Sequence, residues 1–363
     1  MESFFSSFES SPKDPKIYEI LREVLNGEEL NRRNALYLLK TSHPNDILAL
    51  FSAANELRVR YFENKVFAYG FIYFTTYCKN SCSFCYFRKP NSKCLRYRKT
   101  PEEIISQAEK LKESGVHLID MTSGEDPLFF KPNYSGLLSA LSTVKEATEL
   151  PLMVSPGVVP KHVLRKIAEI AEWYALYQET HNRALFAKLR INQDYDERMK
   201  SKIFAKKMRL LIEEGILLGV GESEEDRINS FFTIKDIGAD QVRVMGFVPQ
   251  QGTPMEQNIS PPILEEMKSI ALLRLIHPDK LIPASFDIDG LKGLQLRLLA
   301  GANVITSLIP KTSGLLGVAA ANLGINQGIR SIQTIKPYLD SIGLKLASTH
   351  QYIEFIQQRK RLS

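Results

Sequence analysis

Eight apolar, β-rich runs, separated by amphipathic helical stretches, are the feature that most restricts how this chain can fold. In chain order the runs are VFAYGFIYF, VHLIDM, PLMVS, WYALYQ, ILLGV, DQVRVMGF, LIPASF and NVITSL. Strands that alternate with helices form parallel sheets, because each helix returns the chain to the same edge of the sheet. Eight such units close most simply into a (βα)8 TIM-type barrel, so we predict an α/β fold.

Helix signals between these runs agree with that prediction. Thr100-Pro101-Glu102-Glu103 has the form of a capping box, with Thr100 as the cap and proline in the first helical position. Further helices are predicted over residues 160–172, 195–214, 224–237 and 262–276.

The chain divides into three regions around the barrel. Helical periodicity before the first strand predicts a helical N-terminal extension over residues 1–65, and the barrel then occupies residues 66–312. After the eighth strand comes a loop rich in Gly and Ala, and residues 313–363 are predicted to form a C-terminal extension packed on the barrel.

Composition narrows the class of protein. Hydrophobic residues make up 44% and charged residues 24% of the 363 residues, a balance typical of soluble globular proteins. The net charge of +6 suits an anionic ligand without requiring nucleic acid. The start of the chain has no export signal, and no apolar run approaches the roughly 18 residues of a spanning helix. We therefore predict a cytoplasmic protein with no membrane and no nucleic-acid partner.

Three of the four cysteines, Cys78, Cys82 and Cys85, fall within eight residues. Thiols stay reduced in the cytoplasm, so this crowding indicates metal ligands rather than disulfides. The spacing C-x-x-x-C-x-x-C supplies three thiolates to a [4Fe-4S] cluster and leaves one iron open, where S-adenosyl-L-methionine (SAM) could chelate. The alternative is zinc, but a structural zinc site needs four ligands and only Cys94 remains as a further thiol, which we interpret as a bystander.

Polar residues follow most of the predicted strands, at the end of a barrel where active sites lie. They include Ser123-Gly124-Glu125, Gln178-Glu179-Thr180 and Gly219-Val220-Gly221-Glu222. Any one of them could be an ordinary loop residue. Their accumulation at one end of the barrel predicts an active site there.

The cysteine motif followed by Tyr86-Phe87-Arg88 resembles the radical SAM superfamily. The motifs at 123–125, 177–180, 195–198 and 219–222 resemble those of its biotin synthase and hydrogenase maturase branch, across nearly the whole barrel. Phe84 could stack near adenine or be a core residue, and the cysteine motif favours the first. The resemblance implies that Glu125 lies near the SAM amino group. It also implies that Glu179 and Arg198 hold the ribose and carboxylate ends, with Ser155 and Arg190 as weaker candidates.

Four further residues, Asp120, Arg243, Ser285 and Asp287, resemble the substrate set of the lysine mutases of this branch, which make 3-methylornithine for pyrrolysine biosynthesis. L-Lysine carries one carboxylate and two ammonium groups. By the resemblance, Arg243 holds the carboxylate, Asp287 with Ser285 one ammonium, and Asp120 the other. Alternatively, these charges pair with one another when the pocket is empty. The implied reaction is hydrogen abstraction by a 5'-deoxyadenosyl radical, Cα–Cβ fragmentation and recombination, with an electron donor as partner.

Three other functions compete with this interpretation. A hydrogenase-maturase-like enzyme could use the same SAM motifs on another small amino-acid-derived substrate. Sulfur insertion of the biotin synthase kind needs a second cluster, for which Cys94 alone is insufficient. A zinc-containing nucleic-acid module would use the basic segment 88–99 beside the cysteines.

Overall fold

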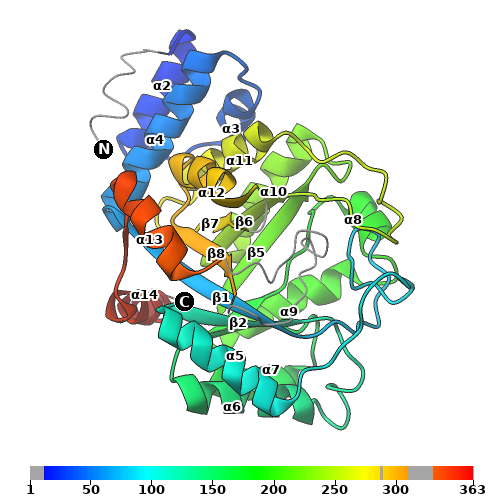
Figure 1. Ribbon diagram of the computed structural model, residues 1–363. Coiled ribbons are helices and arrows are strands. Elements are labelled where there is room, and N and C mark those ends of the chain that lie inside the picture. The colour runs from blue at the N-terminus through cyan, green and yellow to red at the C-terminus, as the bar shows by residue number, and fades with distance from the viewer. Residues whose placement is uncertain (1–11, 287–288, 310–329, 363) are drawn as a thin grey trace.

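The protein is an eight-stranded parallel barrel surrounded by helices (Figure 1). The computed structural model describes residues 12–286, 289–309 and 330–362. The strands of the barrel are β1 (Lys65–Thr75), β2 (Leu118–Ser123), β3 (Leu152–Ser155), β4 (Trp173–Ala175), β5 (Leu211–Leu218), β6 (Gln241–Gly246), β7 (Pro283–Ser285) and β8 (Val304–Leu308). They pair in the order β6-β5-β4-β3-β2-β1-β8-β7, and a parallel bridge from Gln241 to Leu281 brings β6 to β7. The predicted α/β barrel is confirmed.

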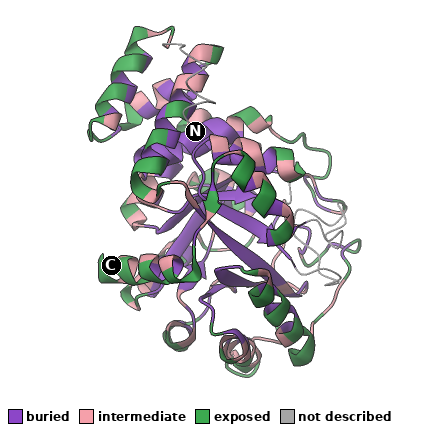
Figure 2. Cartoon of the chain, turned by 60° about the vertical axis from the view of Figure 1, so that its left-hand side comes forward, coloured by how far each residue is buried: buried purple, intermediate pink, exposed green. Residues whose placement is uncertain are grey.

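A layer of helices covers the outside of the barrel. It consists of α5 (Pro101–Ser114), α6 (Ser135–Thr148), α7 (Lys161–Ile170), α8 (Arg183–Leu189), α9 (Tyr195–Lys207), α10 (Glu224–Ile237), α11 (Ile263–Ile276) and α12 (Gly290–Leu299). Figure 2 shows buried strands at the centre, with helices that expose only their outer faces. The capping box predicted at Thr100 and Glu103 is present at the start of α5.

Helices α2 (Pro15–Leu25), α3 (Arg32–Leu39) and α4 (Pro44–Phe62) precede the barrel. They pack on it through α3 and α4, which contact α10 and α11. After the barrel come α13 (Ile332–Ser341), β9 (Lys345–Leu346) and α14 (Thr349–Leu362). The Gly- and Ala-rich loop of the sequence, residues 313–328, lies outside the described residues.

The C-terminal segment closes the end of the barrel where the strands begin. Strand β9 pairs with β1, and Tyr352 of α14 lies with its ring centroid 5.2 Å from that of Phe67. The ring of His117, at the entry to β2, meets the Ala347 carbonyl oxygen at 2.7 Å through Nε2. Because this end is filled by side chains, a ligand can reach the barrel interior only from the carboxyl ends of the strands.

One predicted boundary is wrong. The helix expected over residues 195–214 ends at Lys207, and β5 begins at Leu211. The consecutive acids Glu213 and Glu214 favour an exposed helical face when the sequence is considered alone. In the structure both are fully buried on β5, because each has its own cationic partner, on opposite faces of the strand.

Acid should destabilise this fold through His277, which follows α11 and is 3% exposed. Burial lowers the pKa of His277 from 6.5 to about 4. Between pH 6.5 and pH 4, His277 is therefore protonated in the unfolded chain but not in the folded chain. The free energy of unfolding is at its full value above pH 6.5 and decreases as the pH falls toward 4. At pH 5 the loss from this residue is about 2 kcal/mol, at roughly 1.4 kcal/mol per pH unit.

Urea unfolding of the wild type and of His277→Gln at pH 7 and pH 5 measures this contribution. Gln keeps a donor for the Phe231 carbonyl, which His277 Nε2 approaches at 3.2 Å, but does not titrate. The variant should lose less stability on acidification than the wild type. Equal losses would show that His277 does not carry the effect.

Candidate active site at the open end of the barrel

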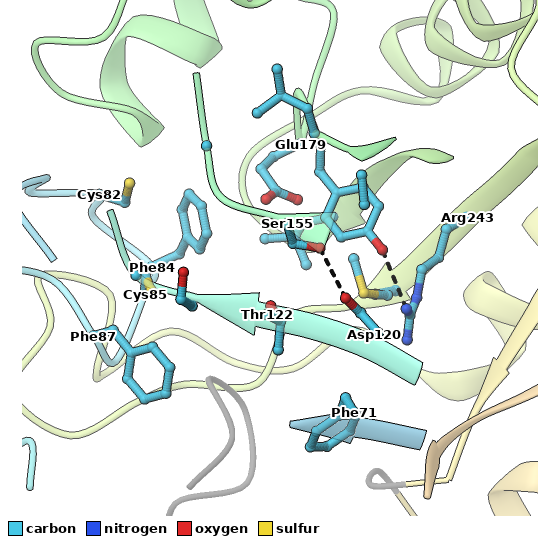
Figure 3. Close-up of a pocket in the computed structure, with 18 of the residues that line it drawn as sticks. Phe71, Cys82, Phe84, Cys85, Phe87, Asp120, Thr122, Ser155, Glu179 and Arg243 are labelled. Carbon is cyan, nitrogen blue, oxygen red and sulfur yellow. Dashed lines mark hydrogen bonds between the residues drawn. The ribbon is translucent and has the colours of Figure 1, made fainter. Parts of the chain in front are cut away.

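One pocket at the carboxyl ends of the strands brings together the predicted site residues (Figure 3). Its lining includes Cys78, Cys82, Phe84, Cys85, Asp120, Glu125, Ser155, Glu179, Arg190, Arg198, Arg243 and Ser285. Asp287, the remaining predicted residue, lies outside the described part of the chain. Figure 3 shows Cys82, Cys85 and Phe84 at one end of the pocket, Asp120 and Arg243 at the other, and Glu179 and Ser155 between them.

The cysteine loop leaves β1 and packs tightly against the end of β2. A Cβ atom added to Gly124 would come within 2.2 Å of the Tyr77 carbonyl oxygen and 2.8 Å of Cys78 Cβ, so this position tolerates no side chain. The Lys79 amide donates to the Glu125 carbonyl oxygen at 3.0 Å. The close approach places Cys78 directly beside the Ser123-Gly124-Glu125 motif.

The thiols suit an iron–sulfur cluster with one open iron. Cys78, Cys82 and Cys85 all line the pocket, and Cys82 Sγ accepts hydrogen bonds from Gln193 Nε2 at 3.0 Å and, at 3.9 Å, from Arg190 Nη1. Donors of this kind stabilise negative charge on a ligating sulfur. Cys94 lies outside the lining, where it packs with Tyr86 and Phe87 and donates to the Leu95 carbonyl at 3.6 Å. The three thiols that line the pocket therefore remain the candidate cluster ligands.

Glu179 and Arg190 form an ion pair near the cysteines, with 2.6 Å between Glu179 Oε1 and Arg190 Nη2. The Arg190 guanidinium also lies over the Phe84 ring, 5.5 Å from its centroid. Burial raises the pKa of the Glu179 carboxyl, and the charge of Arg190 opposes that shift. Glu179 is thus paired with Arg190.

Arg198 also lines the pocket, and two hydrogen bonds hold its guanidinium. Its Nη2 donates to the Tyr177 carbonyl at 2.6 Å and its Nη1 to Gln193 Oε1 at 3.2 Å. Glu125 pairs with Lys79 at 3.0 Å and packs so closely on Gly157 that a Cβ atom there would come within 2.2 Å of Glu125 Oε1. Charged side chains and glycines therefore surround the cysteines. We call the charged residues Glu125, Glu179, Arg190 and Arg198 the cradle.

Three buried polar atoms of this cradle have no hydrogen-bond partner within residues 12–286, 289–309 and 330–362: Glu179 Oε2, Arg190 Nε and Arg198 Nε. Buried polar atoms in proteins are nearly always paired. Their gathering in one pocket, beside the cysteines, fits a polar ligand such as SAM.

Arg243 dominates the inner end of the pocket. Its guanidinium donates to four hydroxyls, at 3.1 Å to Tyr69, 3.4 Å to Tyr177, 2.7 Å to Ser285 and 3.0 Å to Thr306. Glu213 Oε1 lies 3.6 Å from its Nη1 and forms a buried ion pair. Arg243 is therefore balanced by a carboxylate that was not predicted as a site residue from the sequence.

Asp120 lies close to this network. Its Oδ1 accepts from the Ser155 hydroxyl at 3.2 Å. Burial and the nearby charge of Glu213 raise the pKa of Asp120 to about 8, against the opposing effect of Arg243. Asp120 therefore keeps its proton at neutral pH more readily than an exposed aspartate does.

Four residues at the site were not predicted from the sequence: Tyr69, Gln193, Glu213 and Thr306. Tyr177 belongs to the predicted motif at 177–180, but no role was predicted for it. Strand periodicity carried a signal for some of them, because alternate residues of a barrel strand face inward. Tyr69, Phe71 and Tyr73 of β1 line the pocket in this way, and Glu213 lies four residues before the lining residue Leu217 on β5. Gln193 has no such signal, because it lies in the turn between α8 and α9.

The basic segment after the cysteines is largely occupied within the protein. Arg96 donates to the carbonyl groups of Thr76, Phe87, Arg88 and Asn91. Arg98 pairs with Asp126 at 2.7 Å and Lys99 with Glu103 at 3.1 Å. These contacts stabilise the cysteine loop. They also pair, within the protein, much of the positive charge that a nucleic-acid-binding surface would need.

A parallel barrel with a three-cysteine loop after its first strand, and a charged cradle beside it, defines the radical SAM class of enzymes. The sequence profile of the radical SAM superfamily matches residues 72–234. The 3-methylornithine synthase of Methanosarcina barkeri is 42% identical over 327 residues, which cover 90% of this chain and 93% of that protein. The chain therefore belongs to the radical SAM superfamily and, within it, to the family of the 3-methylornithine synthases.

The structural comparison agrees with this assignment. A crystal structure of methylornithine synthase (PylB) superposes with a TM-score of 0.88 at 40% identity, covering 93% of this chain and 99% of that one. The hydrogenase maturase subunit HydE of Thermotoga maritima is 30% identical over 261 residues, which cover 71% of this chain and 74% of that protein. The maturases are thus relatives of lower identity and coverage.

Substitution of single cysteines should separate ligand from bystander. Cys78→Ala, Cys82→Ala and Cys85→Ala should each abolish the cluster and SAM cleavage, because a cubane held by three thiolates does not tolerate the loss of one. Cys94→Ala should retain both. The measurements are iron per chain after anaerobic reconstitution and 5'-deoxyadenosine formation. Loss of iron in Cys94→Ala as complete as in Cys82→Ala would refute the three-ligand assignment.

Proposed function

We propose that this protein isomerises L-lysine to 3-methylornithine, with a [4Fe-4S] cluster and SAM as cofactors. The observation that carries the proposal is the 42% identity to the Methanosarcina barkeri 3-methylornithine synthase over nearly all of both chains. The pocket supports it, because Arg243 and Asp120 offer one cationic and one acidic group to a zwitterion inside a closed barrel. The comparisons support this function over the maturase-like alternative.

The cofactors would occupy the outer half of the pocket. Cys78, Cys82 and Cys85 would hold the cluster, and Phe84, Glu125, Ser155, Glu179, Arg190 and Arg198 would contact SAM. Together with an external electron donor, the bound cluster and SAM supply a radical that removes a hydrogen atom from the substrate. The unpaired atoms of Glu179, Arg190 and Arg198, and the fork of each guanidinium, suit the ribose, amino and carboxylate groups of SAM.

The substrate would lie in the inner half. Arg243 would hold the lysine carboxylate, Asp120 one ammonium, and Ser285 with Asp287 the other. Once the γ hydrogen is lost, scission of the Cα–Cβ bond gives a glycyl radical and 4-aminobut-1-ene. The charged groups of the pocket would hold these two fragments by their opposite ends until Cα bonds to the former γ carbon. The primary radical then left on the former β carbon would take a hydrogen atom back from 5'-deoxyadenosine and become the methyl group. Holding both fragments in place is the main contribution that the protein makes to recombination.

Lysine deuterated at the γ carbon tests this reaction. The reconstituted wild type should convert unlabelled lysine into a product of the same mass, because isomerisation adds and removes no atoms. Some of the deuterium removed from the γ carbon should return to the new methyl group, as read by mass spectrometry and NMR. An isomer whose methyl group never carries deuterium would exclude this route.

The raised pKa of Asp120 predicts how lysine binding depends on pH. Ser155, Glu213 and Arg243 face this carboxyl, and its pKa of about 8 leaves it mostly protonated at pH 7. An ammonium binds the ionised form, so the KM for lysine should fall as the pH rises from 6.5 to 8, by up to about tenfold per unit. Asp120→Asn should show a high KM that does not change over this range. A wild-type KM independent of pH would remove Asp120 from this role.

A further inference from the structure

A fully buried ion pair lies outside the pocket, between the barrel and its helix layer. Lys202 of α9 and Glu214 of β5 form it, and both side chains are completely inaccessible to solvent. Such a pair contributes little net stability, because removing two charges from water offsets their attraction. Its presence therefore calls for an explanation other than stability.

The pair grips one residue of the turn that follows β4. Glu214 Oε1 accepts from the Gln178 amide at 2.7 Å, and Lys202 Nζ donates to Gln178 Oε1 at 3.0 Å. Gln178 is thus held by its main chain and its side chain at once. Its neighbours Tyr177 and Glu179 line the pocket, whereas Gln178 does not.

Glu179 needs such support because its backbone is strained. Its φ of 67° lies in the left-handed region that residues with side chains rarely adopt. Two main-chain hydrogen bonds hold it against β5, from its amide to the Gly215 carbonyl at 3.2 Å and from the Leu217 amide to its carbonyl at 3.0 Å. Strain of this kind persists only where the surroundings enforce it.

We propose that the Lys202–Glu214 pair is a positioning device, which holds the turn of residues 177–179 so that Glu179 presents its carboxylate to SAM. The inference rests on the proposed contact between Glu179 and SAM. The same turn carries Tyr177, whose hydroxyl accepts from Arg243 at 3.4 Å in the inner half of the pocket. The Lys202–Glu214 pair thereby fixes the position of the cofactor half of the pocket relative to the substrate half.

The double variant Lys202→Met with Glu214→Met tests the proposal. Apolar side chains of similar length should preserve the fold, while the Gln178 amide loses its acceptor. Cluster content should match the wild type. The KM for SAM should rise at least about tenfold while kcat at saturating SAM changes by less than about threefold, because positioning affects binding before chemistry. The SAM-induced change in the electron paramagnetic resonance spectrum of the reduced cluster should likewise require more SAM.

A conservative variant provides the rescue. Lys202→Met with Glu214→Gln keeps an Oε1 acceptor for the Gln178 amide without any charge. It should restore the KM for SAM most of the way to the wild-type value. A merely structural role would instead make the two variants differ in thermal stability alone.

A matched control lies at the closed end of the barrel. Arg359 Nε and Asp240 Oδ1 form a largely buried pair at 3.0 Å, and Asp240 Oδ2 also accepts from a backbone amide, that of Ile212, at 3.3 Å. Arg359→Met with Asp240→Met should change the melting temperature and leave the KM for SAM unaltered.

Two results would overturn the inference. One is a wild-type KM for SAM in Lys202→Met with Glu214→Met, and the other is an equal rise in that variant and in the control. A wild type that holds its cluster but cleaves no SAM would refute the proposed function instead, so the two failures are distinguishable.

Discussion

The common direction of the eight strands is the constraint on which the rest of the structure depends. Because all of them run parallel, their carboxyl ends meet at one end of the barrel, and residues far apart in the chain become neighbours there. Cys82, Glu179 and Arg243 follow or lie on β1, β4 and β6, yet they line one pocket. The opposite end is filled by Tyr352 and its neighbours, so the chemistry is confined to a single opening.

Several charged side chains are buried in this molecule, and their burial follows from the closure of the parallel barrel. A barrel interior removes charges from water, and each must then find a partner. Arg243 meets Glu213 within the barrel, Glu179 meets Arg190 at its mouth, and Lys202 meets Glu214 behind the sheet. Only the third pair lies away from the pocket. In the function that we propose, the first pair lies at the substrate, the second at the cofactor, and the third holds the turn that joins them.

The barrel and the cysteine loop could be predicted from the sequence. The eight apolar runs predict the barrel because strand and helix periods are local properties of the chain. The cysteine spacing predicts a ligand loop because Cys78, Cys82 and Cys85 are close in sequence and therefore close in space. The individual substrate and SAM roles came from resemblance, and they stay predictions, as does the role of Asp287 outside the described residues.

The sequence by itself determined the order of strands and helices and the ligand loop, because these follow from local periodicity and spacing. Tertiary structure alone decided which charges meet. Glu213 and Glu214 are adjacent and identical in the sequence, yet the alternation of β5 sends the first to Arg243 inside the barrel and the second to Lys202 outside it. That choice depends on which face of the strand each side chain occupies, and hence on closure of the whole barrel.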